Sequence, residues 1–288
     1  MAKKEKEEVP SVYMNPLTDF GFKKLFQDKD LLIAFLNDVI GTNIKKIKYR
    51  PNEGLGEYKE ERAIVFDLYC TTNNDEYFIV EMQMGSQPYF ENRALFYAAH
   101  AIRKQGVRKK NWDYKYKTVY VVAILDFIIF KEKAAENEVI ERVYLYRENG
   151  KKRFSDKLNF VFIELPKFKK QASELQNNTE TWLFLLKNAF ELETCPQEIT
   201  GKVFKRFLEI AEVKHLTREE METYKLSLKN NFYIRNMAKG ERMEGEMAKS
   251  RQFVTNCAQD GMPIEKIALY TNLTKEQVQE LLEEELVV

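Results

Sequence analysis

Apolar residues recur at helical spacing early in the chain and predict a long helix over residues 19–40. Thr18 is suited to cap the N-terminus of this helix, and Gly41 is a typical helix stop. The apolar positions that define its buried stripe are Phe22, Leu25, Phe26, Leu32, Phe35, Leu36 and Val39. We therefore expect this helix to pack one face into a core.

Short runs rich in β-branched and aromatic residues follow and predict strands over residues 44–50, 63–70, 77–84 and 118–127. A polar turn at residues 73–75 would join the second and third runs as an antiparallel hairpin. Helical spacing over residues 89–105 separates the third run from the fourth, whose continuous hydrophobicity indicates burial on both faces. The order α-β-β-β-α-β predicts a mixed α/β core, with a central sheet flanked by helices.

Beyond residue 139 the pattern predicts one more hairpin, over residues 139–164, and then only helices. The predicted helices cover residues 179–190, 201–213 and 217–237, followed by an exposed linker helix over 238–250 and a short helix-turn-helix-like end. In that end, Thr274 and Gln277 form a capping box. We expect three parts: a disordered lead (1–12), a main domain (13–240) and a small helical tail (241–288).

Composition restricts the chemistry more than it identifies it. The 46 basic and 45 acidic residues nearly cancel, so the net charge does not predict a nucleic-acid binder. Three widely spaced cysteines argue against a disulfide framework or a cysteine zinc site. The longest apolar run, residues 119–130, is too short to span a bilayer, so we expect a cytoplasmic protein with no membrane partner. With only two histidines, any metal would be a hard ion held by oxygens.

Three polar residues, Asp67, Glu81 and Gln83, stand inside strands that otherwise have the composition of a core. Strand side chains alternate between faces, so Glu81 and Gln83 point the same way. Two buried carboxylates on neighbouring strands repel each other, and a divalent cation between them removes the conflict. Asp67, Glu81 and the main-chain carbonyl of Met82 would supply oxygens to Mg²⁺ or another hard divalent ion. Gln83 would orient or polarise a bound water and would not deprotonate it, because an amide is not a base.

This pattern of a mid-strand Asp, a hairpin turn and Glu-x-Gln resembles the PD-(D/E)xK nuclease superfamily. It resembles more closely the Rpn group of recombination-promoting nucleases or putative transposases. The closer likeness lies in residues 18–26, in residues 80–83, and in Arg93 with Tyr97, and it covers roughly residues 14–240. The resemblance implies a restriction-endonuclease-like core and Mg²⁺-dependent endonuclease activity on DNA, linked to recombination, mobile elements or phage defence.

The resemblance also implies roles for individual residues. Asp67 and Glu81 would be metal ligands, Gln83 would occupy the lysine position, and Asp19 would be an auxiliary acid from the first helix. Gln83 departs from the superfamily pattern, because it removes a cation that could stabilise the leaving oxyanion. Phe66 departs too, since the superfamily name has a proline before the acid.

Contacts to nucleic acid are predicted from the second long helix and the basic stretch that follows it. Arg93 and Tyr97 share a helix face at i and i+4, directed either towards the site or into a structural ion pair. We place the basic stretch near the end of the sheet that holds the site, where clustered Lys and Arg suit phosphate contacts. A solvated loop is an equally good interpretation. The candidate contacts are Arg93, Tyr97, Arg103, Lys104, Arg108, Lys109 and Lys110.

The leading hypothesis is therefore a metal-dependent DNA endonuclease. The alternative is a catalytically weak or inactive protein on a nuclease fold that binds DNA or regulates another process. The last predicted helix is strongly acidic and would be repelled by a DNA major groove. For that reason we expect the C-terminal helices to serve self-association, giving a homo-oligomer, or to bind a partner.

Overall fold

The computed structural model describes residues 11–285 except 52, 55–63, 86–88, 107–112, 133–135, 149, 151 and 272. The lead expected over residues 1–12 lies outside the described residues as far as residue 10. The chain divides into two compact units, Met1–Phe232 and Tyr233–Val288. The division expected after residue 240, between a main domain and a small helical tail, stays a prediction.

A six-stranded mixed sheet forms the centre of the first unit, with strand order β1-β4-β5-β6-β8-β7. Its strands are β1 (Ile47–Tyr49), β4 (Leu68–Thr72), β5 (Tyr77–Gln83), β6 (Val119–Leu125), β7 (Ile140–Tyr144) and β8 (Leu158–Glu164). Strands β5, β6 and β8 are parallel, whereas β1, β4 and β7 pair antiparallel with their neighbours. A separate two-stranded ladder joins β2 (Glu53–Gly54) to β3 (Ile64–Val65). The mixed α/β expectation is confirmed.

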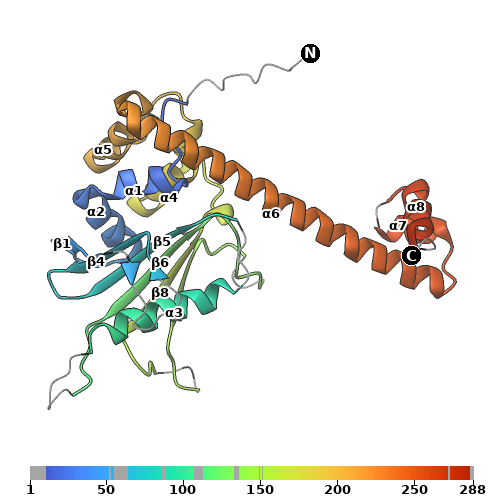
Figure 1. The fold of residues 1–288 in the computed structure, drawn as a ribbon, viewed down its shortest axis with the longest axis horizontal. Coiled ribbons are helices and arrows are strands. Elements are labelled where there is room, and N and C mark those ends of the chain that lie inside the picture. Colours follow the sequence, from blue (N-terminus) through green and yellow to red (C-terminus); the bar gives the residue numbers. More distant parts are fainter. Residues whose placement is uncertain are drawn as a thin grey trace. The chain divides into compact units, whose positions relative to one another are not determined.

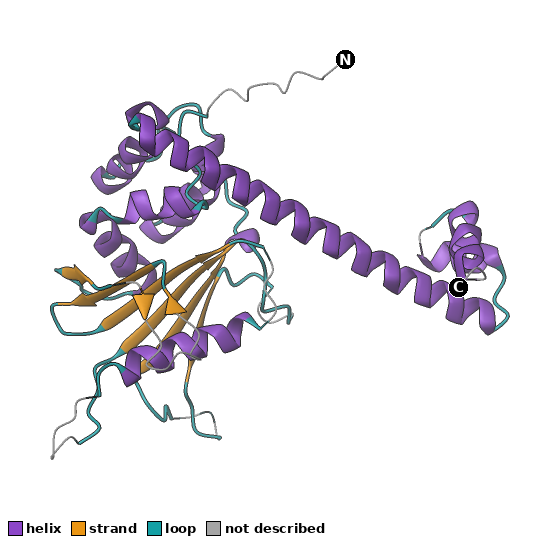
Figure 2. Cartoon of the chain, viewed as in Figure 1, coloured by secondary structure: helices purple, strands orange, loops and turns teal. Residues whose placement is uncertain are grey.

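Helices cover both faces of this sheet (Figures 1 and 2). One face carries α1 (Asp19–Phe26), α2 (Lys29–Ile40), α4 (Asn178–Asn188) and α5 (Lys202–Ala211), and the other carries α3 (Phe90–Arg103). Short 3₁₀ turns, η2 (Leu165–Lys167), η3 (Ala172–Glu174), η4 (Ala189–Glu191) and η5 (Val213–His215), connect these elements. Strand β6, between two parallel neighbours, is buried on both faces as its hydrophobicity predicted.

The prediction of one continuous helix over residues 19–40 is wrong, because the structure has two helices separated by Gln27 and Asp28. The Asp28 carboxylate accepts the main-chain N–H groups of Asp30 (3.0 Å) and Leu31 (3.2 Å), which makes it the N-cap of a new helix. The ends of the pair are as predicted, with Thr18 capping α1 and Gly41 in the left-handed conformation after α2.

The C-terminal helices begin with α6 (Arg218–Gln259), which continues through the residues expected to form a linker. In the second unit, the end of α6 packs with α7 (Ile264–Thr271) and α8 (Lys275–Glu285) around Val254, Ile267 and Val278. The capping box of Thr274 and Gln277 is present in both directions. In the part of the chain that the structure describes, no helix is long and apolar enough to span a membrane. Self-association through these helices stays a prediction.

Candidate active site

Asp67 lies at an interruption of the sheet, and the unbroken strand expected over residues 63–70 is therefore wrong. The Asp67 carboxylate accepts the main-chain N–H of Met82 at 2.8 Å, and the N–H of Asp67 donates to Glu81 Oε1 at 3.2 Å. Strand pairing resumes directly afterwards, with Leu68 opposite Val80. Side-chain to main-chain hydrogen bonds thus replace the ladder at this point and fix Asp67 beside Glu81.

Glu81 and Gln83 share one face of β5, as alternate strand positions require. Val80 and Met82 join the core beneath α1 and α2, whereas Ile79 belongs to the core beneath α3. Glu81 is therefore directed to the α3 side, where it is 1% exposed, and Gln83 there is 6% exposed. The Gln83 amide donates to Glu81 Oε2 at 3.0 Å, so the two side chains form one hydrogen-bonded unit.

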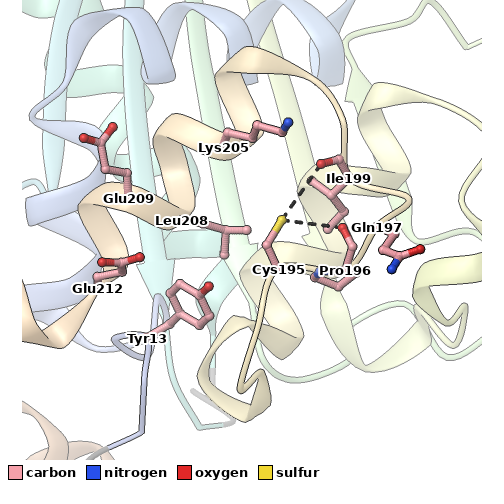
Figure 3. A pocket seen from close by; sticks show the side chains of 9 residues that line it. All are labelled: Tyr13, Cys195, Pro196, Gln197, Ile199, Lys205, Leu208, Glu209 and Glu212. Atoms are coloured by element: carbon pink, nitrogen blue, oxygen red, sulfur yellow. Dashed lines mark hydrogen bonds between the residues drawn. The ribbon is translucent and has the colours of Figure 1, made fainter.

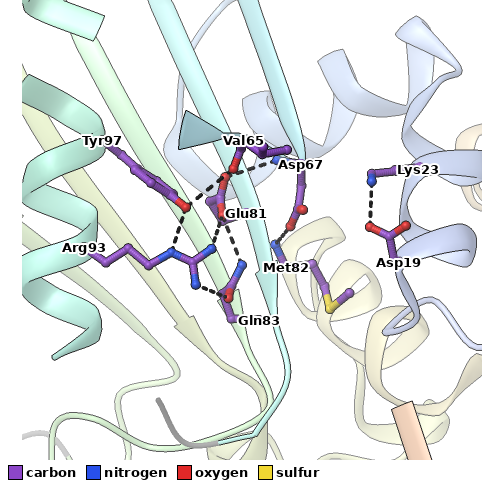
Figure 4. A network of polar contacts seen from close by, with 9 residues as sticks. All are labelled: Asp19, Lys23, Val65, Asp67, Glu81, Met82, Gln83, Arg93 and Tyr97. Carbon is purple, nitrogen blue, oxygen red and sulfur yellow. Dashed lines mark hydrogen bonds and ion pairs between the residues drawn. The ribbon is translucent and has the colours of Figure 1, made fainter. Parts of the chain in front are cut away.

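Arg93 from α3 completes a network around these residues (Figure 4). Its Nη1 donates to Gln83 Oε1 at 3.0 Å, its Nη2 lies 3.4 Å from Glu81 Oε2, and its Nε donates to the Tyr97 hydroxyl at 2.7 Å. The guanidinium also lies over the Tyr97 ring, 5.1 Å from its centroid. Arg93 thus contacts the predicted site residues and forms an ion pair with one of them, so both alternatives for Arg93 and Tyr97 stay open.

The electrostatics of the pair favour a bound cation. The pKa of Glu81 is raised from 4.5 to about 8, chiefly by burial and next by the charge of Asp67. The N–H of Asp67 and the cations of Arg93 and Lys23 act in the opposite direction. Burial also raises the pKa of Asp67, against the effect of the Met82 N–H and Lys23. Two neighbouring acids with raised pKa values are each stabilised in the ionised form by a nearby positive charge.

Asp19 faces this pair from α1, across from Asp67 in Figure 4. Its carboxylate forms an ion pair with Lys23 at 2.7 Å, and it is 64% exposed. Both residues act on the pKa of Asp67, Lys23 lowering it and Asp19 raising it. The predicted auxiliary acid thus lies in the neighbourhood of the site, where it is paired with Lys23.

Sequence reasoning missed two residues that shape the site. Lys23 is not among the predicted site residues, although it lies one helical turn after Asp19 and lowers the pKa of both carboxyl groups. Asp126 follows β6; its N–H donates to the Gln83 carbonyl at 3.2 Å and its Oδ1 accepts the Gly85 N–H at 2.7 Å. Asp126 therefore fixes the end of β5 that carries Gln83. Its signal was a charge within the most apolar run of the chain.

Arg103 and Lys104, the described candidates of the basic stretch, do not lie where they were expected. Helix α3 starts after the end of β5 that carries Gln83 and runs back, so Arg103 and Lys104 lie beside the segment that leads into β6. The start of β6 pairs with Tyr77, four residues before Glu81, which is about 13 Å along the strand. The placement of Arg103 and Lys104 beside the site is wrong, because a helix of this length spans the sheet. Arg108, Lys109 and Lys110 lie outside the described residues.

A cavity of about 360 Å³ lies elsewhere, at the N-terminal end of the described chain and along α5 (Figure 3). Tyr13, Cys195, Lys205 and Glu212 are among its lining residues, and none of the predicted site residues lines it. The Cys195 thiol is 3.5 Å from the Pro196 carbonyl oxygen. This cavity therefore gives no support to the predicted chemistry, which depends on the carboxylate pair.

The donors at the pair suit a hard divalent ion, because they are carboxylate oxygens whose ionised form needs a positive charge. Asp67 and Glu81 would hold the ion, and the main-chain carbonyl of Met82 is the predicted third donor. Among the described residues, no group of three or more His, Cys, Asp or Glu side chains could hold a metal ion. A metal here would thus depend on two side chains, main-chain oxygen and water.

A mixed α/β fold that places the half-buried Asp67 beside the buried Glu81 is compatible with a nuclease fold. Residues 16–240 match the family model described as PD-(D/E)XK nuclease family transposase. This match covers well over half of the chain, and the chain belongs to that family, which confirms the resemblance found in the sequence. Comparison with curated proteins and with solved structures gave no significant match. Family membership supports a nuclease- or transposase-related function.

Proposed function

We propose that this protein is a metal-dependent DNA endonuclease on a restriction-endonuclease-like core, acting in recombination, on mobile elements or in phage defence. The observation that carries the proposal is the contact between the Asp67 and Glu81 segments. The Glu81 carboxylate accepts the main-chain N–H of Asp67, and the Asp67 carboxylate accepts the main-chain N–H of Met82. The chain holds these acids together although burial raises both pKa values and the charge of Asp67 raises that of Glu81 further. Such an arrangement is typical of functional sites.

The residues have separate tasks in this proposal. Asp67 and Glu81 bind the cation, Mg²⁺ or a similar hard ion. Such an ion supplies Lewis-acid stabilisation of the phosphate and lowers the pKa of a bound water. The amide of Gln83 is held by Glu81 and Arg93, so it can orient a water but cannot accept its proton. Asp19 would assist from α1 as an auxiliary acid.

The substrate contacts belong to two surfaces of the chain. Arg93 and Tyr97 lie within the site, where they can meet the phosphate that is cut. Arg103 and Lys104, at the other end of the sheet, can contact only more distant phosphates of the same DNA. Because phosphate contacts fix position and carry no sequence information, these residues would give affinity without sequence preference.

The test is cleavage of supercoiled plasmid by the full chain and by Asp67→Asn. We expect Mg²⁺-dependent nicking by the wild type and a loss of at least about 100-fold in the variant, because a direct metal ligand matters more than the residues that support it. Asp260→Asn, an exposed aspartate at the end of α6, is the matched control and should cleave like the wild type.

Equal cleavage by the wild type and Asp67→Asn would contradict the proposal and identify a contaminant. Retarded DNA migration without any cleavage would favour the alternative, an inactive nuclease fold that binds DNA. The observation in favour of that alternative is Gln83, a neutral residue at the position where the family name has lysine.

A further inference from the structure

The side chain at position 83 brings no charge to the site. Gln83 is 6% exposed, and both ends of its amide are engaged, one with Glu81 and the other with Arg93. The family description has a lysine at this place of the motif, and a lysine would bring one positive charge next to the two acids. A phosphodiester gains negative charge as it is cleaved, so a site without that cation lacks one means of stabilising the transition state.

Arg93 brings a positive charge to the same place from another element. Its guanidinium contacts Gln83 Oε1 at 3.0 Å and lies 3.4 Å from Glu81 Oε2, which puts its charge beside the position-83 side chain. An arginine is charged at every pH at which the protein is folded. The charge that is absent from β5 is thus present on α3.

The guanidinium is also held in a defined orientation. Nε donates to the Tyr97 hydroxyl at 2.7 Å, and the guanidinium carbon lies 5.1 Å from the Tyr97 ring centroid and 6.0 Å from that of Phe90. Aromatic and hydrogen-bonding contacts that fix a cation before the substrate arrives reduce the reorganisation needed during the reaction.

The exposed fractions of the two side chains show which of them an anion can reach. The Arg93 side chain is 35% exposed, whereas that of Glu81 is 1% exposed. Arg93 is therefore the accessible member of this ion pair, and an approaching phosphate can reach it. The planar guanidinium fork matches two phosphate oxygens, and arginine suits this contact better than lysine does.

We propose that Arg93, positioned by Gln83 and Tyr97, is the catalytic cation of this site and contacts the scissile phosphate in place of the motif lysine. This inference rests on the proposed nuclease function. In it, Gln83 is a positioning residue: its carbonyl oxygen accepts from Arg93, whereas a lysine at the same position would repel the guanidinium. The glutamine is then an adaptation to the arginine, and the two residues act as one unit.

The experiment compares single-turnover plasmid cleavage at saturating Mg²⁺ by the wild type, Arg93→Gln, Gln83→Lys and the double variant. We expect Arg93→Gln to lose about 100-fold or more, as is usual when one group that stabilises transition-state charge is removed. Gln83→Lys alone should gain nothing, because its new charge competes with Arg93. The double variant should cleave at least about tenfold faster than Arg93→Gln, since the cation returns from β5.

Two further variants separate catalysis from folding and from bulk charge. Arg93→Lys keeps a positive charge and should cleave faster than Arg93→Gln, which gives a readout even if the glutamine variant unfolds. Arg218→Gln makes the same change at a residue whose side chain is 94% exposed, and it should cleave like the wild type. Mg²⁺ affinity measured by calorimetry shows whether Arg93 acts only by neutralising Glu81.

The outcomes separate the proposed nuclease function from the proposed role of Arg93. A wild type that cleaves no DNA overturns the proposed function, and the inference falls with it. If the wild type cleaves DNA and Arg93→Gln cleaves at the full wild-type rate at saturating Mg²⁺, the inference alone is overturned. Arg93 would then affect only metal binding. A large gain in Gln83→Lys would also overturn it, since the wild-type site would then lack a cation.

Discussion

Two glutamates, one near the end of β5 and one at the end of β8, are almost equally buried and differ in what surrounds them. Glu81 on β5 is 1% exposed and Glu164 on β8 is 0% exposed, and both point to the α3 side of the sheet. Glu164 is 2.6 Å from the Lys167 ammonium, itself buried, and it accepts the main-chain N–H groups of Ile129 and Phe130. Its charge is neutralised within the protein.

Glu81 has the opposite environment. Its nearest acidic neighbour is Asp67, whose charge raises the pKa of Glu81, and its cation, Arg93, is at 3.4 Å and open to solvent. Burial of a carboxylate therefore does not by itself identify a site in this protein. The distinguishing feature is a second acid beside the first, with a cation that a substrate can reach.

Neutralising each glutamate in turn tests this difference most directly. We expect Glu164→Gln to lower the free energy of unfolding by about 3–5 kcal/mol, because the buried Lys167 ammonium loses its carboxylate. Glu81→Gln should change it by less than about 1 kcal/mol at pH 7, since the neutral amide replaces an acid whose pKa is about 8. Urea unfolding of the metal-free proteins measures both values.

The control for this pair is Glu209→Gln, which alters an ion pair with Arg206 in which the glutamate is 59% exposed. It should change stability by no more than about 0.5 kcal/mol. If Glu81→Gln proved as destabilising as Glu164→Gln, the carboxylate pair would be a structural element, and the distinction between the two glutamates would be lost.

The fold could be predicted where one local pattern decides the structure. The apolar run of β6, the hairpin between β4 and β5 and the caps at Thr18 and Gly41 all follow from residue types and spacing. The errors at Asp28 and Asp67 have a common cause. In both places a carboxylate binds main-chain N–H groups and interrupts an element whose apolar periodicity continues past it.

The site could be predicted only in part, because polar residues in apolar strands are ambiguous. That criterion selected Asp67 and Glu81, and it applies equally to Glu164 at the end of its own apolar strand. The buried Lys167 and the main-chain N–H groups of Ile129 and Phe130 neutralise Glu164, whereas Glu81 has Asp67 beside it. The placement of Arg103 failed for another reason, since the return of α3 along the sheet depends on its length and direction.

A smaller effect should appear in the dependence of stability on pH. The pKa of Glu81 is about 8 in the folded protein and near 4.5 when unfolded, so the folded state binds the proton more tightly. Its stabilising contribution is complete below pH 4.5 and is lost as pH rises towards 8, by at most about 1.4 kcal/mol per pH unit. Burial of Asp67 acts in the same direction.

The measurement is urea unfolding in EDTA at pH 5.5, 6.5 and 7.5 for the wild type and for Glu81→Gln. The wild type should lose stability with rising pH relative to the variant, which lacks this titration. Parallel curves for the two proteins would show that Glu81 ionises with a normal pKa, and the electrostatic contrast with Glu164 would then have no basis.

The smallest expected effect concerns the metal itself, and it sharpens the comparison because only one of the two glutamates is proposed to bind it. A ligand that binds the folded state alone stabilises it by RT ln(1 + [L]/Kd), about 1 kcal/mol at five times Kd. Mg²⁺ or Mn²⁺ should therefore raise the melting temperature of the wild type, and more at pH 8 than at pH 6, because protons compete for the same oxygens.

Glu81→Gln and Asp67→Asn should each lose this increment, whereas Glu209→Gln should retain it. Arg93→Gln should retain it as well, since removal of a neighbouring cation leaves the acids more dependent on the metal. An equal increment in Glu81→Gln would place the ion elsewhere on the chain. The two acid variants should lose the metal-induced rise in melting temperature while their unfolding without metal stays unchanged. That result would show that the oxygens of Asp67 and Glu81 are held together for an ion, whereas Glu164 is paired with Lys167.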